Sequence, residues 1–198
     1  GRYSLALTKA IIKNKKNHEI VIAISNLFPD TIEEITKEFK ELLPKQNIKI
    51  WNAISPTKEC EEENKPNRKT SQLLREIFLS NLKPDIILIS SLFEGYTDDA
   101  VLSIQEYKTK IPTATILYDL IPFISPEKYL SYKPTSLWYY SKIDMLKKSN
   151  SLLSISNSAK REAIDYLNIN ENIITNISTA VDTTIFFFFL DISSLKEK

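Results

Sequence analysis

Residues 113–122 read Thr-Ala-Thr-Ile-Leu-Tyr-Asp-Leu-Ile-Pro, and this stretch decides the fold class. Its first five residues, 113–117, are all β-branched or apolar. The polar pair Tyr118-Asp119 follows this run, and Pro122 comes three residues later. A strand covered on both faces has this continuous pattern, whereas a strand with one wet face alternates. Thr113–Tyr118 is therefore predicted to be a buried strand of a parallel sheet.

Similar short runs recur along the chain and alternate with longer segments that carry an apolar stripe on one helical face. This alternation is typical of βαβ units, so the sequence predicts an α/β fold with one open, mostly parallel, Rossmann-like sheet and helices on both faces. The predicted strands are Glu19–Ser25, Ile48–Ala53, Asp85–Ser90, Thr113–Tyr118, Ser151–Ile155 and Ile173–Ser178. The predicted helices are Arg2–Asn14, Thr31–Leu43, Ser71–Leu82, Asp98–Lys108, a stretch within Thr135–Lys148, and Ser158–Leu167. The predicted helix caps are Asp30, Thr70 and either Asn157 or Ser158.

Composition limits the class of protein. The 198 residues carry 26 basic and 25 acidic side chains, so a net charge of +1 provides no overall field that would gather nucleic acid. Hydrophobic residues make up 42% of the chain, a proportion that suits one folded domain. No stretch of about 18 consecutive apolar residues occurs, so the sequence predicts no segment that spans a bilayer. A single histidine, His18, and a single cysteine, Cys60, exclude a His-based metal site and an internal disulfide. We expect a cytoplasmic protein with no metal ion and no cofactor.

Two segments match neither a helix nor a strand. Thr57–Thr70 is charged, contains proline and has no apolar period, so a mobile surface loop is expected there. Ile185–Leu190 reads Ile-Phe-Phe-Phe-Phe-Leu, which is too apolar for a free tail. This run is expected to pack on the domain or to meet a second one.

Ligands of an open parallel sheet collect beyond the carboxyl ends of the strands, where loops and helix N-termini meet. Gly1-Arg2 opens the first predicted helix, where glycine permits close approach of an anion and arginine can make two charge-assisted hydrogen bonds. By themselves these two residues fit an exposed chain end better than an anion site. Glu94-Gly95 follows a predicted strand, so Glu94 could accept hydrogen bonds from a sugar hydroxyl, or the pair could form a surface turn.

Two more candidates follow the next strands. Tyr118-Asp119 places a phenol and an acid at the edge of the sheet, although Asp119 could instead cap the backbone of the Leu120–Pro122 turn. Ser156-Asn157-Ser158 has the residues of a helix N-cap, and the amides that follow could also bind a phosphate.

Five groups of residues carry a family resemblance when they are taken in order. They are Gly1–Leu5; Ser91–Tyr96 with Asp98–Val101; Tyr118–Pro122 with Pro126–Leu130; Ser154–Ala163; and Asn176–Asp182. Together they resemble the N-terminal domain of the large bacterial group 1 family of retaining glycosyltransferases, which has the GT-B fold. Each motif is modest, but the ordered set extends to about residue 182 and is therefore specific.

The resemblance implies the acceptor side of a cleft enzyme. Residues 1–182 would form this Rossmann-like domain without the family's first strand, which should precede Gly1, and residues 183–198 would lead to a C-terminal domain that binds a nucleotide-sugar. Tyr118 and Asp119 are expected at the reaction centre. The residues expected at the substrate are Gly1, Arg2, Glu94, Gly95, Ser156 and Ser158.

This chain departs from the family at two places. Many relatives have histidine where this chain has Tyr118, and tyrosine is a poor proton acceptor near neutral pH, so the role of a general base does not transfer to it. The family's donor-binding pair of glutamates, separated by seven residues, belongs to the second domain. Glu33 and Glu41 have this spacing but lie on the polar face of an early predicted helix without a neighbouring glycine, so we interpret the match as coincidence.

The resemblance predicts transfer of a sugar, with retention of configuration, from a nucleotide-sugar to a glycan or lipid-linked acceptor. The isolated chain is expected to be inactive, and the whole protein is expected in the cytoplasm or at the inner face of the membrane. Two alternatives remain open at this point. One is a non-catalytic glycan-binding or degenerate transferase domain, and the other is a flavodoxin-like signalling domain in which Asp119 accepts a phosphoryl group.

Overall fold

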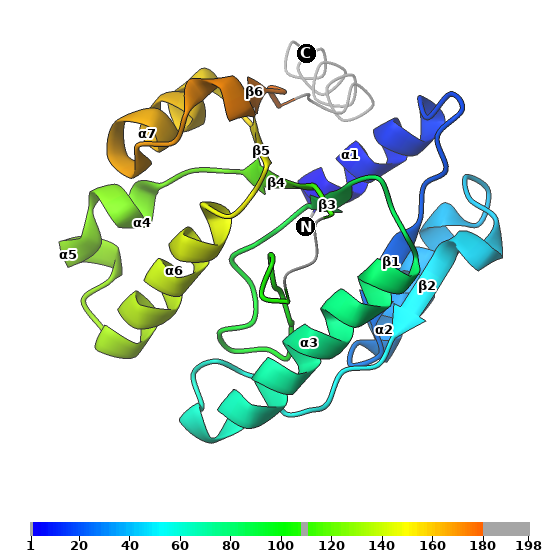
Figure 1. Ribbon diagram of the computed structural model, residues 1–198, viewed down its shortest axis with the longest axis horizontal. Helices are drawn as coiled ribbons and strands as arrows, with labels where there is room; N and C mark the ends of the chain where they lie inside the picture. The colour runs from blue at the N-terminus through cyan, green and yellow to red at the C-terminus, as the bar shows by residue number, and fades with distance from the viewer. Residues whose placement is uncertain (1, 108–110, 180–198) are drawn as a thin grey trace, which may run out of the picture.

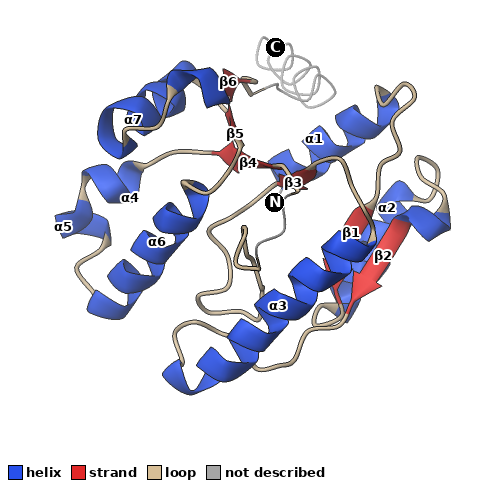
Figure 2. Cartoon of the chain, in the orientation of Figure 1, coloured by secondary structure: helices blue, strands red, loops and turns tan. Residues whose placement is uncertain are grey.

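The computed structural model describes residues 2–107 and 111–179, and these form an α/β fold with helices on both sides of parallel strands, as expected (Figures 1 and 2). The strands are β1 (Ile22–Ser25), β2 (Ile48–Trp51), β3 (Ile87–Ile89), β4 (Thr113–Leu117), β5 (Ser151–Ser154) and β6 (Ile174–Asn176). The helices are α1 (Arg2–Lys13), α2 (Pro29–Phe39), α3 (Lys65–Asn81), α4 (Ile121–Ile124), α5 (Pro126–Tyr129), α6 (Lys133–Leu146) and α7 (Asn157–Leu167). Short 3₁₀ turns span Lys45–Asn47, Glu62–Asn64 and Glu171–Ile173.

The six strands form two sheets, so the expectation of one sheet is wrong. β1 pairs with β2, and a second sheet has the order β3-β4-β5-β6; every pairing is parallel. Within the described residues no strand pairs with both β1 and β3, so the two sheets are separate.

The core lies mainly around the four-stranded sheet. All five residues of β4 are buried, in agreement with the continuous apolar run from which it was predicted. Leu152 of β5 packs with buried side chains of α6 and α7, such as Ile143 and Ala163. A smaller cluster of Ile12, Phe39 and Leu43 covers the β1–β2 pair. Burial of these apolar side chains is the main force that holds each layer together.

The predicted helix Asp98–Lys108 is wrong for its described residues, which form no helix up to Tyr107. Side chains of α3 hold this backbone instead. Glu76 accepts hydrogen bonds from the amides of Glu106 and Tyr107 at 3.0 and 2.7 Å, and Arg75 donates to the carbonyl of Ser103 at 2.9 Å. These tertiary partners replace the hydrogen bonds that a helix would have made.

Thr57–Thr70 is not a mobile surface loop. Thr57 and Asn64 are buried, and α3 already begins at Lys65. The Thr57 amide donates to the Asp99 carboxylate, and Glu59 forms ion pairs with Lys142 and Arg68. The charges of this segment are used for contacts within the protein, which its composition could not reveal.

Three helix starts also differ from the expectation. α2 begins at Pro29, so Asp30 lies in its first turn, where a negative charge interacts favourably with the helix dipole. Thr70 is inside α3, where its hydroxyl donates to the carbonyl of Pro66. The cap of α7 is Ser156, whose Oγ accepts from the Ala159 amide at 3.0 Å, rather than Asn157 or Ser158.

The predicted linker, residues 183–198, and the Ile185–Leu190 run lie outside the described residues. In the part of the chain that the structure describes, no helix has both the length and the apolar character needed to cross a membrane.

Candidate functional site

Segments that are distant in sequence meet beyond the carboxyl ends of β3 and β4. The Tyr118 hydroxyl, just after β4, donates to the Ser90 carbonyl, just after β3, at 3.0 Å. Ser4 of α1 donates to the same carbonyl at 3.3 Å and shares a hydrogen bond of 2.9 Å with the Tyr118 hydroxyl. The N-terminus of α1 is therefore fixed at the sheet edge where the sequence predicted a site.

Tyr118 is held in place on two sides. Its half-buried ring makes an edge-to-face contact with Tyr3, with the centroids 5.8 Å apart. The Tyr3 hydroxyl donates to the Ser178 carbonyl at 3.1 Å, and burial, aided by the neighbouring Tyr118, raises the pKa of Tyr3. The Tyr118 hydroxyl is thus engaged within the protein by Ser4 and Ser90.

Asp119 is exposed, and it caps the turn that follows β4. Its Oδ1 accepts from the Ile121 amide at 3.1 Å, so the predicted capping role is confirmed. Glu162 of α7 secures the same turn, since its Oε2 accepts from the Leu120 amide at 2.9 Å. The carboxylate of Asp119 is thus held at the mouth of the site by a braced backbone.

A pocket of about 320 Å³ opens beside Tyr118 and Asp119. Its volume is at the lower end of the range usual for small-molecule sites. Phe93, Trp138 and Tyr139 form one aromatic wall of the pocket. The ring centroid of Phe93 lies 5.0 Å from that of Tyr139 and 6.4 Å from that of Trp138. The lining residues are Ser91, Leu92, Phe93, Tyr118, Asp119, Pro122, Trp138 and Tyr139.

The sequence did not indicate the part of this wall that α6 contributes. The run Trp138-Tyr139-Tyr140 was the only available signal, and a helical aromatic run more often indicates core than a ligand site. Behind the wall, the buried Lys142 ammonium lies 5.9 Å from the Trp138 ring centroid and 2.7 Å from Glu59 Oε1. This ion pair ties α6 to the Thr57–Thr70 segment and so supports the wall.

Two polar atoms of the wall are buried without a hydrogen-bond partner of good geometry among the described residues. They are Nε1 of Trp138 and the hydroxyl of Tyr139. Burial raises the pKa of Tyr139, and the negative charge of Asp119 adds to this effect, while the nearby backbone of Phe123 opposes it. Tyr139 therefore stays a neutral phenol that can only donate to, or accept from, a polar neighbour.

Glu94 and Gly95 have separate surroundings. Glu94 is exposed, and its Oε1 accepts from the Ser91 hydroxyl at 2.6 Å, next to the pocket. Gly95 is buried, and its carbonyl accepts from the Glu59 amide at 2.9 Å. The pair forms a turn whose glycine contacts the protein interior, so only Glu94 points to solvent near the site.

The remaining predicted residues lie at helix N-termini. Ser156 caps α7, and exposed Ser158 donates to Glu162 Oε1 at 3.2 Å, which connects it indirectly to the Asp119 turn. Arg2 is exposed at the first residue of α1. Gly1 lies outside the described residues. The structure therefore brings Tyr118 and Asp119 together at the pocket. Glu94 is connected to the pocket through Ser91, and Ser158 is connected to the Asp119 turn through Glu162.

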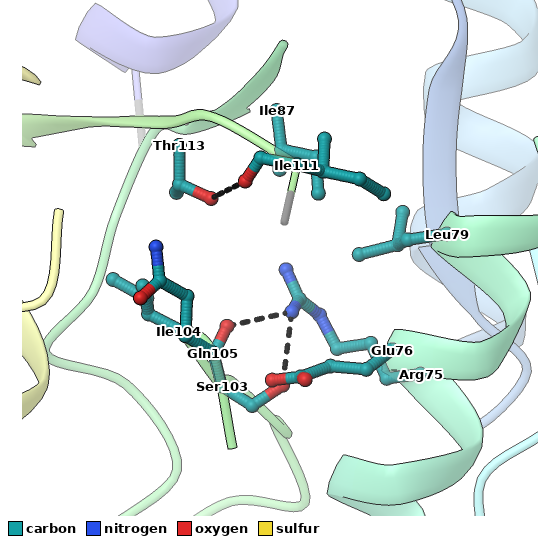
Figure 3. A pocket seen from close by; sticks show the side chains of 9 residues that line it. All are labelled: Arg75, Glu76, Leu79, Ile87, Ser103, Ile104, Gln105, Ile111 and Thr113. Atoms are coloured by element: carbon teal, nitrogen blue, oxygen red, sulfur yellow. Dashed lines mark hydrogen bonds between the residues drawn. The ribbon is translucent and has the colours of Figure 1, made fainter. Parts of the chain in front are cut away.

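A second hollow, at the opposite edge of the sheet, is structural (Figure 3). It lies at the first residues of β3 and β4, Ile87 and Thr113, and its volume of about 10 Å³ would hold about one water molecule. Arg75 points into it and is fixed by the carbonyl and hydroxyl of Ser103 (Figure 3). Burial lowers the pKa of Arg75 to about 10, which still leaves it charged at neutral pH.

Among residues 2–107 and 111–179, no three His, Cys, Asp or Glu side chains gather as a group that could hold a metal ion. The chemistry that the pocket itself offers is an aromatic surface, a carboxylate and hydroxyl groups. These groups suit a polar, uncharged ligand with an apolar face.

Comparison with known proteins connects this chain to glycosyltransferases. It is 32% identical over 204 residues to a serotype-specific mannosyltransferase WbdA of Escherichia coli, an alignment that covers 100% of this chain and 24% of that protein. Two further WbdA proteins of Escherichia coli are 32% and 31% identical over 97% of the chain and 24% of their own length. No family model matches the chain, and no solved structure matches it. The chain thus spans about a quarter of the length of these relatives, and its similarity to them agrees with the glycosyltransferase resemblance of the loop motifs.

Proposed function

We propose that this chain is the acceptor-side domain of a longer retaining glycosyltransferase of the GT-B type. In this proposal the whole protein moves a hexosyl group from a nucleotide-sugar to a glycan or lipid-linked acceptor at the cytoplasmic side of the membrane. The observation that carries the proposal is the pocket at the carboxyl edge of the sheet, where an aromatic wall faces a carboxylate. The WbdA relatives are mannosyltransferases, which favours mannose as the sugar handled.

The pocket has the two kinds of surface that a sugar ring needs. A pyranose has an apolar face of C–H groups, and Phe93 and Trp138 provide aromatic surface against which that face could pack. Its hydroxyls need hydrogen-bond partners, and the Asp119 carboxylate is an acceptor at the rim. In a largely apolar pocket, a small number of polar groups fixes the orientation of a small ligand.

The residues then have distinct roles in the proposal. Asp119 would accept from a sugar hydroxyl at the reaction centre, and Tyr118 would position the ligand without acting as a base. Exposed Arg2, together with the first amides of α1, would face the donor diphosphate that the second domain holds. Rate enhancement would come from positioning of the two substrates and stabilisation of the leaving diphosphate.

The test uses the full-length protein with a panel of nucleoside-diphosphate sugars and a fluorescently tagged mannoside acceptor. Asp119→Asn retains an atom that can accept from the Ile121 amide but removes the charge, so it should lower kcat/KM by at least about tenfold. Asp144→Asn, an exposed change on α6 away from the pocket, is the matched control and should retain activity. NMR of the product would show the anomeric configuration.

Three results would contradict the proposal. The first is full activity of Asp119→Asn, the second is inversion of configuration, and the third is steady turnover by residues 1–198 alone. If the full-length protein binds the mannoside but transfers nothing to it, the non-catalytic glycan-binding function replaces the proposed one.

A further inference from the structure

The aromatic wall of the pocket is built from two elements that are distant in sequence. Phe93 comes from the loop after β3, whereas Trp138 and Tyr139 come from α6. Tyr96 of the same loop also contacts Trp138, with the ring centroids 5.2 Å apart. The shape of the wall therefore depends on how the loop after β3 is held against α6.

One residue, Glu59, connects these two elements. Its amide donates to the Gly95 carbonyl at 2.9 Å, and the next amide, that of Cys60, donates to the Tyr96 carbonyl at 2.9 Å. Its side chain reaches α6, where Oε1 lies 2.7 Å from the Lys142 ammonium. The backbone of Glu59 is thus fixed to the loop after β3, while its carboxylate is fixed to α6.

The ion pair is held away from solvent, since only 1% of the Lys142 side chain and 15% of the Glu59 side chain are exposed. Among the described residues Glu59 is the one ion-pair partner of Lys142, and Arg68 lies 3.6 Å from the other carboxylate oxygen. Desolvation offsets much of the attraction in a buried pair, but displacement of either partner leaves a buried charge without compensation. The pair therefore restricts geometry more than it stabilises the fold.

Lys142 extends this restriction to Trp138. The two residues are four positions apart on α6, so they lie on the same face of the helix. The Lys142 ammonium is 5.9 Å from the Trp138 ring centroid, a separation at which a cation is attracted to the face of an indole ring. Trp138 is thus held by Tyr96 of the loop and by Lys142 of its own helix. Neither Glu59 nor Lys142 lines the pocket.

We propose that Glu59 and Lys142 are positioning residues of the acceptor site, which orient Trp138 and thereby set the affinity for the acceptor sugar without contacting it. This inference rests on the proposed function, in which the apolar face of a sugar ring packs against Trp138. Such packing is a sum of many short-range contacts, so a rotation of the indole ring away from the sugar weakens it. The effect concerns the acceptor alone, because the donor diphosphate is assigned to other groups.

The test uses the full-length protein with Lys142→Met, which removes the ammonium but leaves Glu59 its second partner, Arg68. A second variant, Glu59→Gln with Lys142→Met, removes both charges, and replacement of a buried ion pair by uncharged groups is often neutral for stability. Thermal melts show whether each variant is folded. The matched control is Lys148→Met with Glu106→Gln, which removes another lysine–glutamate pair, just beyond the end of α6 and outside the pocket lining.

Binding of the tagged mannoside, followed by fluorescence anisotropy, should weaken by about threefold or more in both variants and stay unchanged in the control. The KM for the acceptor should rise by a similar factor, while the KM for the nucleotide-sugar and kcat at saturating acceptor stay within about twofold. Unchanged mannoside affinity in the folded variants would overturn the proposal. Equal losses for acceptor and donor, or unfolding of both variants, would also overturn it, because the pair would then serve the stability of the whole fold.

Trp138→Leu shows whether the pair acts through the indole ring. Removal of the ring should itself weaken mannoside binding, and the addition of Lys142→Met should then cause little further loss. Additive losses would mean that Lys142 acts by another route, which contradicts the proposal. Because binding is measured without turnover, a protein that binds the mannoside but transfers nothing refutes the proposed reaction, while the same comparison still decides the positioning role. Absence of mannoside binding in the unchanged protein would refute both.

Discussion

Gly95 is a residue whose identity the backbone requires. Its φ of +90° is a conformation that side chains rarely adopt, and a Cβ at this position would lie 2.3 Å from the Ala100 carbonyl oxygen. Its own carbonyl holds the Glu59 amide, so the turn after β3 is joined to the segment that supports the aromatic wall.

We therefore expect Gly95→Ala to destabilise the protein by more than about 1 kcal/mol, because both the dihedral angle and the contact become unfavourable. Urea unfolding followed by circular dichroism measures the change. Asn168→Gly is the control, since Asn168 has a φ of 55° at the end of α7 and glycine accepts this conformation readily. A stability loss of Gly95→Ala no larger than that of the control would contradict the steric explanation.

Asp99 is a second residue whose role is defined by its contacts. Burial opposes its charged form, but hydrogen bonds from the Thr57 amide and from the hydroxyls of Ser55 and Thr57, with the charge of Lys58, together lower its pKa below the ordinary value. A lowered folded-state pKa stabilises the protein above the ordinary carboxyl pKa. That contribution is lost as the pH falls through the lower, folded-state value.

Asp99→Asn should therefore lower the stability at pH 7 and weaken its dependence on pH between about 5 and 2. Thermal melts of both proteins across that range give the comparison. The difference between the two proteins should be largest at neutral pH and shrink in acid. A constant difference over the whole range would show that the charge of Asp99 contributes nothing.

At the scale of elements, capping separates two serines that looked alike in the sequence. Ser156 accepts from the Ala159 amide, whereas Ser158 lies in the first turn of α7 and contacts only Glu162 through its side chain. Ser156→Ala should therefore cost about 1 kcal/mol of stability, and Ser158→Ala should cost less than about 0.5 kcal/mol. Chemical denaturation of the two variants tests this, and equal losses would refute the assignment of the cap.

The strands were predictable because local pattern decides them, while several other elements depend on distant partners. The apolar run 113–118 identifies β4 without any other information, and the site at the carboxyl ends of β3 and β4 follows from the parallel topology. By contrast, residues 98–107 are held by Glu76 and Arg75 of α3, which no local pattern reveals. The same holds for Trp138, which reaches the pocket only because α6 packs beside β3 and β4.

At the scale of the whole molecule, the division into two sheets coincides with a division of the core. The large cluster joins β4, β5, α6 and α7, whereas the β1–β2 pair is covered by the small cluster of Ile12, Phe39 and Leu43. Regions with few buried apolar contacts open at lower free energy than the global transition. The β1–β2 layer of residues 1–198 is therefore expected to be the less stable part.

Two core truncations of similar severity distinguish these regions. Phe39→Ala and Leu152→Ala each remove a fully buried side chain, at a cost of about 2–5 kcal/mol. In native-state amide exchange, Phe39→Ala should accelerate exchange in β1 and β2 while β4 and β5 keep their protection. Leu152→Ala should accelerate exchange in all strands, because the larger core sets the global stability. If Phe39→Ala reduces protection in β4 as much as in β1, the two layers unfold as one cooperative unit. The absence of strand pairing between β1 and β3 in the described residues then does not weaken the coupling of the two layers.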